Sequence, residues 1–210
     1  QQPYVSLSGN NGLNIGFMNT LEGVELLYAS KVDANLDPLW NANGIRVYSS
    51  GFLSQINPIL VEDESNYTYY FWTEYRYQTL PIYYDVFVQK FDANGNGQWI
   101  GGGEPLFESF FGDKYVRDAY VAADGNLLVV WNTLTLDGST LYVSKIDSQT
   151  GDVIWTDPLA DEEYKQSNSV SCYDATSDEL WVAWEDLRNI LQGVDIYASQ
   201  YNSDGVVIDD

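Results

Sequence analysis

The sequence contains no histidine and only one cysteine, Cys172. Without histidine the chain can form neither a Ser–His–Asp triad nor a Cys–His pair. A single cysteine closes no internal disulfide and builds no thiolate zinc site, and we interpret Cys172 as a small buried hydrophobe in a strand. The catalysis that remains open is carboxylate chemistry, because two acids suffice to hydrolyse a glycoside.

Positive charge is also scarce, with 9 Lys and Arg against 31 Asp and Glu and a net charge of -22. Such a surface repels the phosphates of nucleic acids and anionic lipid headgroups, so we expect no nucleic-acid partner. No apolar run is long enough to span a membrane, and we expect no membrane insertion. Acidity and the shortage of cysteine favour an exported protein, extracellular or on the cell surface. Because the chain begins with Gln1, we expect it to be processed or to belong to a longer array.

Aromatic residues make up 15% of the chain and recur with a fixed period. One strand-and-turn unit appears four times, as LYASKVDAN, VFVQKFDAN, LYVSKIDSQ and IYASQYNSD, and its aromatic anchors are Tyr28, Phe87, Tyr142 and Tyr197. An aromatic residue precedes each unit (Phe17, Trp72, Trp131, Trp184), and a tryptophan follows the first three (Trp40, Trp99, Trp155). The spacing of 55 to 59 residues between anchors predicts a repeat architecture, in which the equivalent rings pack between neighbouring repeats.

Each repeat divides into four short segments rich in Val, Ile, Tyr, Phe and Trp, separated by turn residues, which is the pattern of an all-β fold. The expected strands are 4–7, 13–17, 26–32 and 38–47; then 56–61, 67–76, 84–91 and from 98 onward; then 119–122, 127–131, 141–146 and 153–155; then 170–173, 180–184, 196–201 and 206–208. Four strands in each repeat predict a β-propeller-like array of four four-stranded blades in a single domain. The approximate blade boundaries are 1–51, 52–110, 111–163 and 164–210. A linear β-solenoid ranks second and a β-sandwich third.

The turn at 92–97 matches the opening of a calcium-binding loop, D-x-[DN]-x-[DN]-G. Asp92, Asn94 and Asn96 would supply oxygen ligands, and Ca²⁺ is the one cofactor that we consider for this chain. The closing glutamate of such a loop would fall at Gly103, and Glu104 misses that place by one residue. A β-turn held by Asp and Asn side chains explains the same residues without a metal.

The motif W-x-[DE]-x-R occurs twice, once ending at Arg76 and once ending at Arg188. Residues two apart on a strand share a face, so each arginine lies beside its own acid and near its tryptophan. The favoured interpretation is an ion pair with the guanidinium packed on the indole ring. The alternative is a ligand-binding arginine at each place.

Tyrosines surround the long connection between the second and third strands of the second repeat. Tyr77, Tyr83 and Tyr84 flank that loop, next to a strand that is itself rich in tyrosine. Exposed tyrosines beside carboxylates can stack on sugars or dock a protein. We therefore take Tyr77, Tyr83 and Tyr84, together with Arg76 and Arg188, as candidate ligand-binding residues, and we name no catalytic residue.

The segments W-E-D-L-R at 184–188 and D-I-Y-A-S-Q-Y-N-S-D-G at 195–205 resemble repeats of secreted and surface-exposed bacterial proteins of the Bacteroidetes type, W-x-D-x-R…D-I-Y-A-Q. The resemblance covers nearly the whole chain in four imperfect copies, and the third repeat and Asp209 depart from the pattern. It implies a propeller-like fold and an exported, adhesive or otherwise binding protein, with no particular ligand.

These observations together favour a non-enzymatic, secreted or cell-surface module that mediates protein or glycan binding, or adhesion, within a larger assembly. One alternative is a glycan-active enzyme, or its accessory domain, that uses an Asp/Glu pair. Another is a structural fibre subunit whose exposed sheet edges join copies of the chain. The expected partners are a protein or a glycan, and other copies of the chain are a further option.

Overall fold

The chain is seen in a computed structural model, which describes residues 3–9, 11–21, 23–48, 55–75, 83–99, 103–107, 111–160, 165–188, 191 and 193–209. Every regular element within these ranges is a β-strand, so the all-β prediction is confirmed. The described residues include no helix that is long and apolar enough to cross a membrane.

The strands form four antiparallel sheets, each built from four strands that are consecutive in the chain. The first sheet holds β1 (Tyr4–Leu7), β2 (Leu13–Leu21), β3 (Val24–Val32) and β4 (Ile45–Arg46). The second holds β5 (Gln55–Glu62), β6 (Thr68–Glu74), β7 (Asp85–Phe91) and β8 (Glu104–Pro105). The third holds β9 (Asp113–Val121), β10 (Leu127–Leu134), β11 (Ser139–Ile146) and β12 (Val153–Pro158). The fourth holds β13 (Gln166–Asp174), β14 (Glu179–Asp186), β15 (Asp195–Asn202) and β16 (Val207–Asp209).

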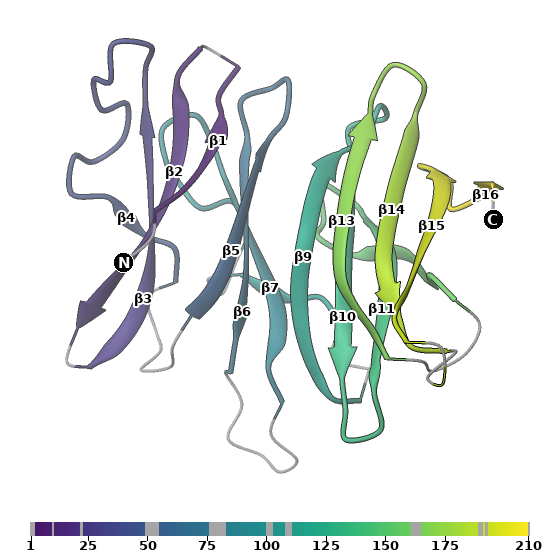
Figure 1. Cartoon of the computed structure of the whole chain (residues 1–210). Coiled ribbons are helices and arrows are strands. Elements are labelled where there is room, and N and C mark those ends of the chain that lie inside the picture. The colour runs from purple at the N-terminus through teal and green to yellow at the C-terminus, as the bar shows by residue number, and fades with distance from the viewer. Residues whose placement is uncertain are drawn as a thin grey trace. The chain divides into compact units, whose positions relative to one another are not determined.

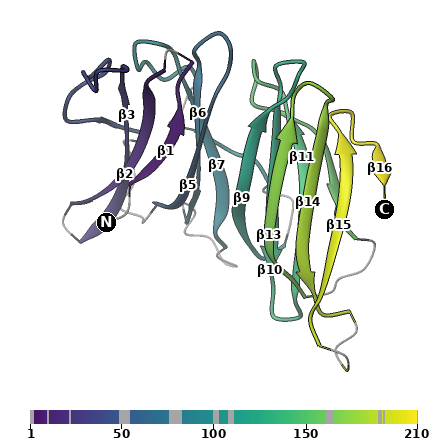
Figure 2. The same ribbon diagram turned by 45° about the horizontal axis from the view of Figure 1, so that its top comes forward.

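The four sheets are grouped in two compact units, residues 1–108 and 109–210. The first unit, purple to blue in Figure 1, contains the first and second sheets, and the second unit, teal to yellow, contains the third and fourth. Figure 2 shows the strands of the fourth sheet following one another in chain order, with β16 last. The predicted division into four sheets of four strands is therefore confirmed.

The fourth strand of the first sheet is much shorter than predicted, covering Ile45–Arg46 rather than 38–47. The chain turns before this strand, because the amide of Gly44 donates to the carbonyl of Asn41 at 2.8 Å. The turn lets Trp40 lie in the core, where it is 5% exposed, instead of along the sheet. Burial of this ring outweighs the pairing that an extended segment would gain.

The fourth strand of the second sheet also starts later than predicted, at Glu104 rather than at Gln98. The amide of Gln98 still donates to the carbonyl of Lys90 at 2.8 Å, but no named strand begins there. Gly103 has a φ of 103°, a left-handed conformation that delays the extended chain until the next residue.

The first strands of the third and fourth sheets, β9 and β13, are longer than predicted. β9 begins at Asp113 and β13 at Gln166, whereas the sequence suggested 119–122 and 170–173. Each strand contains a register shift, so its alternation of apolar and polar residues is broken part of the way along. The sequence pattern therefore indicated only the second half of each strand.

The repeated aromatic residues form one stacked pair across the second and third strands of every sheet. The pairs are Phe17–Tyr28, Trp72–Phe87, Trp131–Tyr142 and Trp184–Tyr197, and each joins residues that are direct partners in the strand register. Their ring centroids lie 4.6 to 6.2 Å apart with interplanar angles of 18° to 24°. Within a sheet, the period seen in the sequence thus becomes a cross-strand stack.

The stacked pair gives each sheet two distinguishable faces. We call the face that carries the pair the pair face, and the opposite one the reverse face. In the first unit the core joins reverse-face residues of the first sheet (Met18, Leu27, Ala29) to pair-face residues of the second (Tyr70, Trp72, Phe87). In the second unit it joins reverse-face residues of the third sheet (Leu128, Val130, Leu141, Val143) to pair-face residues of the fourth (Leu180, Val182, Trp184). Both units therefore pack a reverse face on a pair face.

Cys172 lies on the reverse face of the fourth sheet and is exposed, so the prediction of a buried cysteine is wrong. The neighbouring Tyr173 points to the other face and packs against the core of the second unit. Because neighbouring side chains on a strand alternate between the two faces, the strand buries Tyr173 and leaves Cys172 outside.

In each unit, the tryptophan that follows the first repeat unit packs on the turn of the second sheet of that unit. Trp40 of the first sheet donates its Nε1 hydrogen to the carbonyl of Ala93, at 3.0 Å, in the turn of the second sheet. A Cβ atom placed on Gly95 of that turn would lie 3.1 Å from the Trp40 ring. Gly205 in the fourth sheet is in the same situation, 3.1 Å from the ring of Trp155 in the third. Glycine is needed at these two turns to let the indole approach.

We expect Gly95→Ala to destabilise the first unit more than Gly23→Ala does. Both glycines have a positive φ, 82° and 86°, so both substitutions impose a similar backbone strain. A methyl group on Gly95 would overlap Ile45 and crowd Trp40, whereas nothing lies within 4 Å of one on Gly23. The extra loss should be about 1–3 kcal/mol in urea unfolding. Equal losses would show that the indole does not depend on this approach.

Candidate functional site

The first W-x-[DE] motif places a buried carboxylate beside the stacked pair of the second sheet. Glu74 is 1% exposed. Its Oε2 accepts hydrogen bonds from Trp72 Nε1 at 2.7 Å and from Gln55 Nε2 at 2.9 Å. Asp85 is its direct partner on the neighbouring strand, so two acids stand side by side at this end of the sheet. The carboxylate of Glu74, which belongs to β6, is thus hydrogen-bonded to β5 through Gln55.

The second motif builds an equivalent centre in the fourth sheet around Asp186, which is fully buried. Its carboxylate accepts from Trp184 Nε1 at 3.2 Å, from the amide of Arg188 at 2.7 Å and from Arg188 Nη2 at 2.7 Å. Burial raises the pKa of Asp186, but the hydrogen bonds from Arg188 and Trp184 outweigh it and hold that pKa below its ordinary value.

Arg188 combines the ion pair with Asp186 and a cation–π contact with Tyr197. Its guanidinium carbon lies 3.8 Å from the centre of the Tyr197 ring. The structure thus has the ion pair of the favoured interpretation, while the ring that the cation covers belongs to Tyr197 and not to Trp184. Arg76, the arginine of the first motif, falls outside the described residues, as does Tyr77. Ligand binding by Arg76, Arg188 and Tyr77 stays a prediction.

Two glutamines that the sequence reading overlooked connect these centres to the preceding sheets. The Oε1 atom of Gln55 accepts from the amide of Leu27 in the first sheet at 2.8 Å. The Oε1 atom of Gln166 accepts from the amide of Leu141 in the third sheet at 2.7 Å. Gln55 also donates to Glu74, whereas the buried Nε2 of Gln166 has no hydrogen-bond partner in the structure.

A shared sequence signal could have revealed these glutamines. Each opens a Q-x-N segment, and Asn57 and Asn168 both have a positive φ, 53° and 49°. The register of β5 and of β13 shifts at these asparagines. Asparagine tolerates the left-handed conformation, so Q-x-N marks a β-bulge that follows a buried glutamine.

Two of the candidate tyrosines lie at the same end of the second sheet as Glu74. Tyr83 and Tyr84 directly precede β7, and both are half-buried. The Tyr84 ring lies 5.8 Å from the ring of Tyr75, which directly follows β6, and the two planes are tilted by 55°. The strand ends thus bring Tyr75 and Tyr84 together next to the buried carboxylates of Glu74 and Asp85.

The proposed calcium ligands form a closed hydrogen-bonded turn. One oxygen of Asp92 accepts from the amides of Asn94 and Asn96, both at 2.9 Å, and the other accepts from Asn96 Nδ2 at 2.9 Å. Among the described residues no group of three or more His, Cys, Asp or Glu side chains is arranged to hold a metal ion. The arrangement fits the β-turn interpretation, and binding of Ca²⁺ by Asp92, Asn94 and Asn96 stays a prediction.

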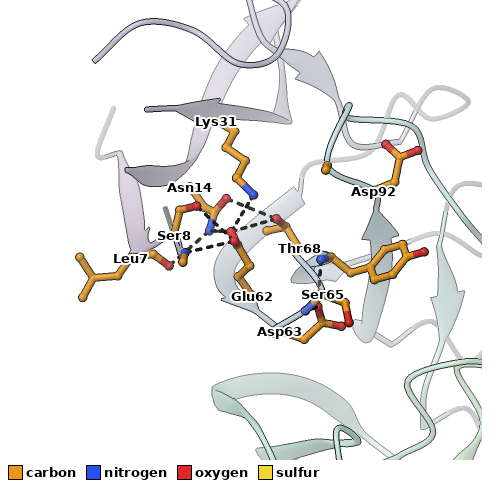
Figure 3. A network of polar contacts seen from close by, with 12 residues as sticks. Leu7, Ser8, Asn14, Lys31, Glu62, Asp63, Ser65, Thr68 and Asp92 are labelled. Atoms are coloured by element: carbon orange, nitrogen blue, oxygen red, sulfur yellow. Dashed lines mark hydrogen bonds and ion pairs between the residues drawn. The ribbon is translucent and has the colours of Figure 1, made fainter. Parts of the chain in front are cut away.

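A second buried network, at the opposite ends of β5 and β6, joins the two sheets of the first unit (Figure 3). Glu62 of the second sheet pairs with Lys31 of the first at 2.9 Å, and their side chains are 3% and 2% exposed. Glu62 also accepts from Asn14 Nδ2 at 2.6 Å and from Ser8 Oγ at 3.1 Å. Both charges are therefore removed from water and depend on each other.

Several hydrogen bonds keep the Glu62 carboxylate ionised. Burial raises its pKa, but the bonds from Asn14, Lys31 and the amide of Gly9 outweigh burial, so its pKa lies below the ordinary value of 4.5. A carboxylate saturated in this way, with 3% exposure, holds sheets together and is not placed to meet a ligand.

No protein-family model and no curated protein sequence matches the chain. Solved structures match its fold at low identity. A protein of unknown function from Dyadobacter fermentans has a TM-score of 0.63 at 12% identity over 94% of this chain and 64% of its own, so this chain spans less than two thirds of it. An endo-arabinase from Bacteroides thetaiotaomicron has a TM-score of 0.56 at 13% identity over 99% of this chain and 80% of its own. An endo-1,4-beta-xylanase from the same organism has a TM-score of 0.54 at 11% identity over 99% and 72%. These likenesses bear on the fold alone.

We expect Gln55→Met to cost more stability than Gln166→Met. Both variants leave a backbone amide, Leu27 or Leu141, without its acceptor. Only Gln55→Met also deprives a buried carboxylate, that of Glu74, of a donor, which should add about 1–3 kcal/mol. Urea unfolding followed by tryptophan fluorescence measures both losses, and a larger loss for Gln166→Met would contradict the assignment.

We expect Glu62→Gln to destabilise the first unit by about 3–5 kcal/mol at neutral pH, because the substitution leaves the buried Lys31 ammonium group without its carboxylate partner. The double variant Lys31→Met/Glu62→Leu should be more stable than Glu62→Gln, since no charge remains in the interface. The lowered pKa of Glu62 adds to wild-type stability above pH 4.5, and this contribution is lost as the pH falls through the folded value. The gap in unfolding free energy between wild type and Glu62→Gln should therefore narrow in acid. A gap that widens would contradict the lowered pKa.

Proposed function

We propose that the chain is an exported, propeller-like module that binds polysaccharide chains without cleaving them. The four repeated sheets would act as a rigid support, and the binding surface would lie at the end of the second sheet that carries Tyr75, Tyr83 and Tyr84. Cell-surface or extracellular location belongs to the same proposal, and it is supported by the net charge of -22 and by the single cysteine.

The observation that carries the proposal is the group of tyrosines beside β6 and β7. Tyr83 and Tyr84 are half-buried, and the contact between Tyr84 and Tyr75 holds two rings near each other where two strands end. A tyrosine fixed in this way offers a flat apolar face to the C–H side of a sugar and a hydroxyl to its oxygens. Glu74, next to these rings, ties the end of β6 to β5 through Gln55, which favours a preformed site.

The state of the carboxylates supports binding rather than hydrolysis. Glu74 is 1% exposed, and its Oε2 atom already accepts from the Trp72 indole and from the Gln55 amide. Asp186 is committed to Arg188 and Trp184 in the same way. A general acid or nucleophile of a glycosidase must reach the scissile bond, whereas the carboxylates of Glu74 and Asp186 are buried.

Glycan hydrolysis is the second candidate, and one observation favours it. Glu74 and Asp85 are direct cross-strand partners, an arrangement that places their Cβ atoms about 4.5–5.5 Å apart. Two of the similar structures bear the names endo-arabinase and endo-1,4-beta-xylanase, which also makes arabinan and xylan the polysaccharides to try first. Release of reducing ends that disappears in Glu74→Gln would establish this function in place of binding.

We expect Tyr84→Ala to weaken binding to arabinan or xylan by about tenfold, because one stacked sugar contact is worth roughly 1–1.5 kcal/mol. Affinity electrophoresis in gels that contain each polysaccharide measures the effect. Tyr115→Ala, which removes a half-buried tyrosine in the second unit, is the matched control and should migrate like wild type. Equal retardation of wild type and Tyr84→Ala in every gel would contradict the site.

A further inference from the structure

The reverse face of the fourth sheet presents apolar side chains to solvent. Val170 is 69% exposed, Trp181 43% and Ile196 71%, and the exposed Cys172 is the register partner of Trp181. Ala183 and Ala198 complete the rows between them. Trp181 is the one tryptophan of the seven that does not belong to the repeat pattern. It therefore adds to this face a large ring that the repeat does not require.

The pair face of the first sheet is open in a corresponding way. Val5 and Leu7 are 62% and 82% exposed. Ile15, Phe17 and Tyr28 lie on the same face and are half-buried. In Figure 3 the side chain of Leu7 points away from the buried network around Glu62.

The two cores of the molecule indicate what covers each kind of face. In both units a reverse face packs on a pair face. By the same rule, the open reverse face of the fourth sheet would pack on a pair face, and the open pair face of the first sheet would pack on a reverse face. The two open faces are therefore of complementary kinds.

The residues at the edge of these two faces also fit each other, because both are uncharged where the first unit has an ion pair. In the first unit Lys31, three residues after the anchor Tyr28, meets Glu62, the last residue of β5. The fourth sheet has Gln200 three residues after its anchor Tyr197, where the first three sheets have lysine. The first sheet has Leu7 as the last residue of β1, at the place of Glu62. Contact between the two open faces would therefore bury no charge at this position.

We propose that the reverse face of the fourth sheet binds the pair face of the first sheet of a second copy of this chain. The contact is head-to-tail, so each copy offers one face and receives the other. Apolar burial supplies the affinity, while the net charge of -22 on each copy opposes it at long range. Association should therefore tighten as salt screens the repulsion. This surface is separate from the proposed polysaccharide site, and either proposal can fail alone.

The test uses two variants that each block one face. Leu7→Lys places a charge on the open pair face, and Ile196→Lys places one on the open reverse face; both positions are exposed enough that folding is unaffected. In sedimentation velocity over a concentration series, wild type should associate, and each variant alone should associate at least about tenfold more weakly. An equimolar mixture of the two variants should form a dimer, because one free face of each kind remains. Leu136→Lys, at a fully exposed residue between β10 and β11, is the control and should behave like wild type.

The reactivity of Cys172 toward maleimide locates the contact, since this thiol lies on the open reverse face. It should be protected in wild-type assemblies and exposed in Ile196→Lys. A monomeric wild type with a reactive Cys172 overturns the proposal, because the face is then uncovered. A monomeric wild type with a protected Cys172 also overturns it, because the cover then comes from the same chain. Association that survives both lysine variants shows that copies join through another surface.

Discussion

The cross-strand aromatic pair is the interaction on which the rest of this structure depends. It joins the second and third strands of every sheet. In the second and fourth sheets it forms part of the face on which the reverse face of the preceding sheet packs. Where the pair includes a tryptophan, a buried indole N–H needs an acceptor. The three sheets concerned supply different ones, Glu74, Ser144 and Asp186. The buried polar centres are therefore consequences of the aromatic pairs.

Much of the fold could be read from the sequence, because repeated strands carry the same local signal four times. The four-sheet division and the central strands follow from alternation and from turn residues. The short fourth strands could not be read, since the burial of Trp40 depends on an acceptor in the next sheet. Cys172 was misplaced for a related reason: a sequence shows that side chains alternate but does not show which face another sheet covers.

The sequence predicted which residue types form the candidate site, but it predicted few of the contacts between them. The ion pair between Arg188 and Asp186 follows from their two-residue spacing, and the structure confirms it. Tyr197 beneath the guanidinium, and Gln55 beside Glu74, come from other strands. Gln55 also binds Leu27, 28 residues earlier in the chain. Such long-range partners leave no periodic trace, although the repeated Q-x-N segment would have drawn attention to both glutamines.

The contact between Trp40 and the turn at Ala93 has a consequence for the order in which the protein is made. The indole and its acceptor are separated by 53 residues, so a ribosome must synthesise nearly a whole further sheet before the first one can finish its core. Until then a large ring stays accessible to the folding machinery of the cell. Maturation of the nascent chain would thus advance by pairs of sheets, each earlier sheet waiting for the arrival of its successor.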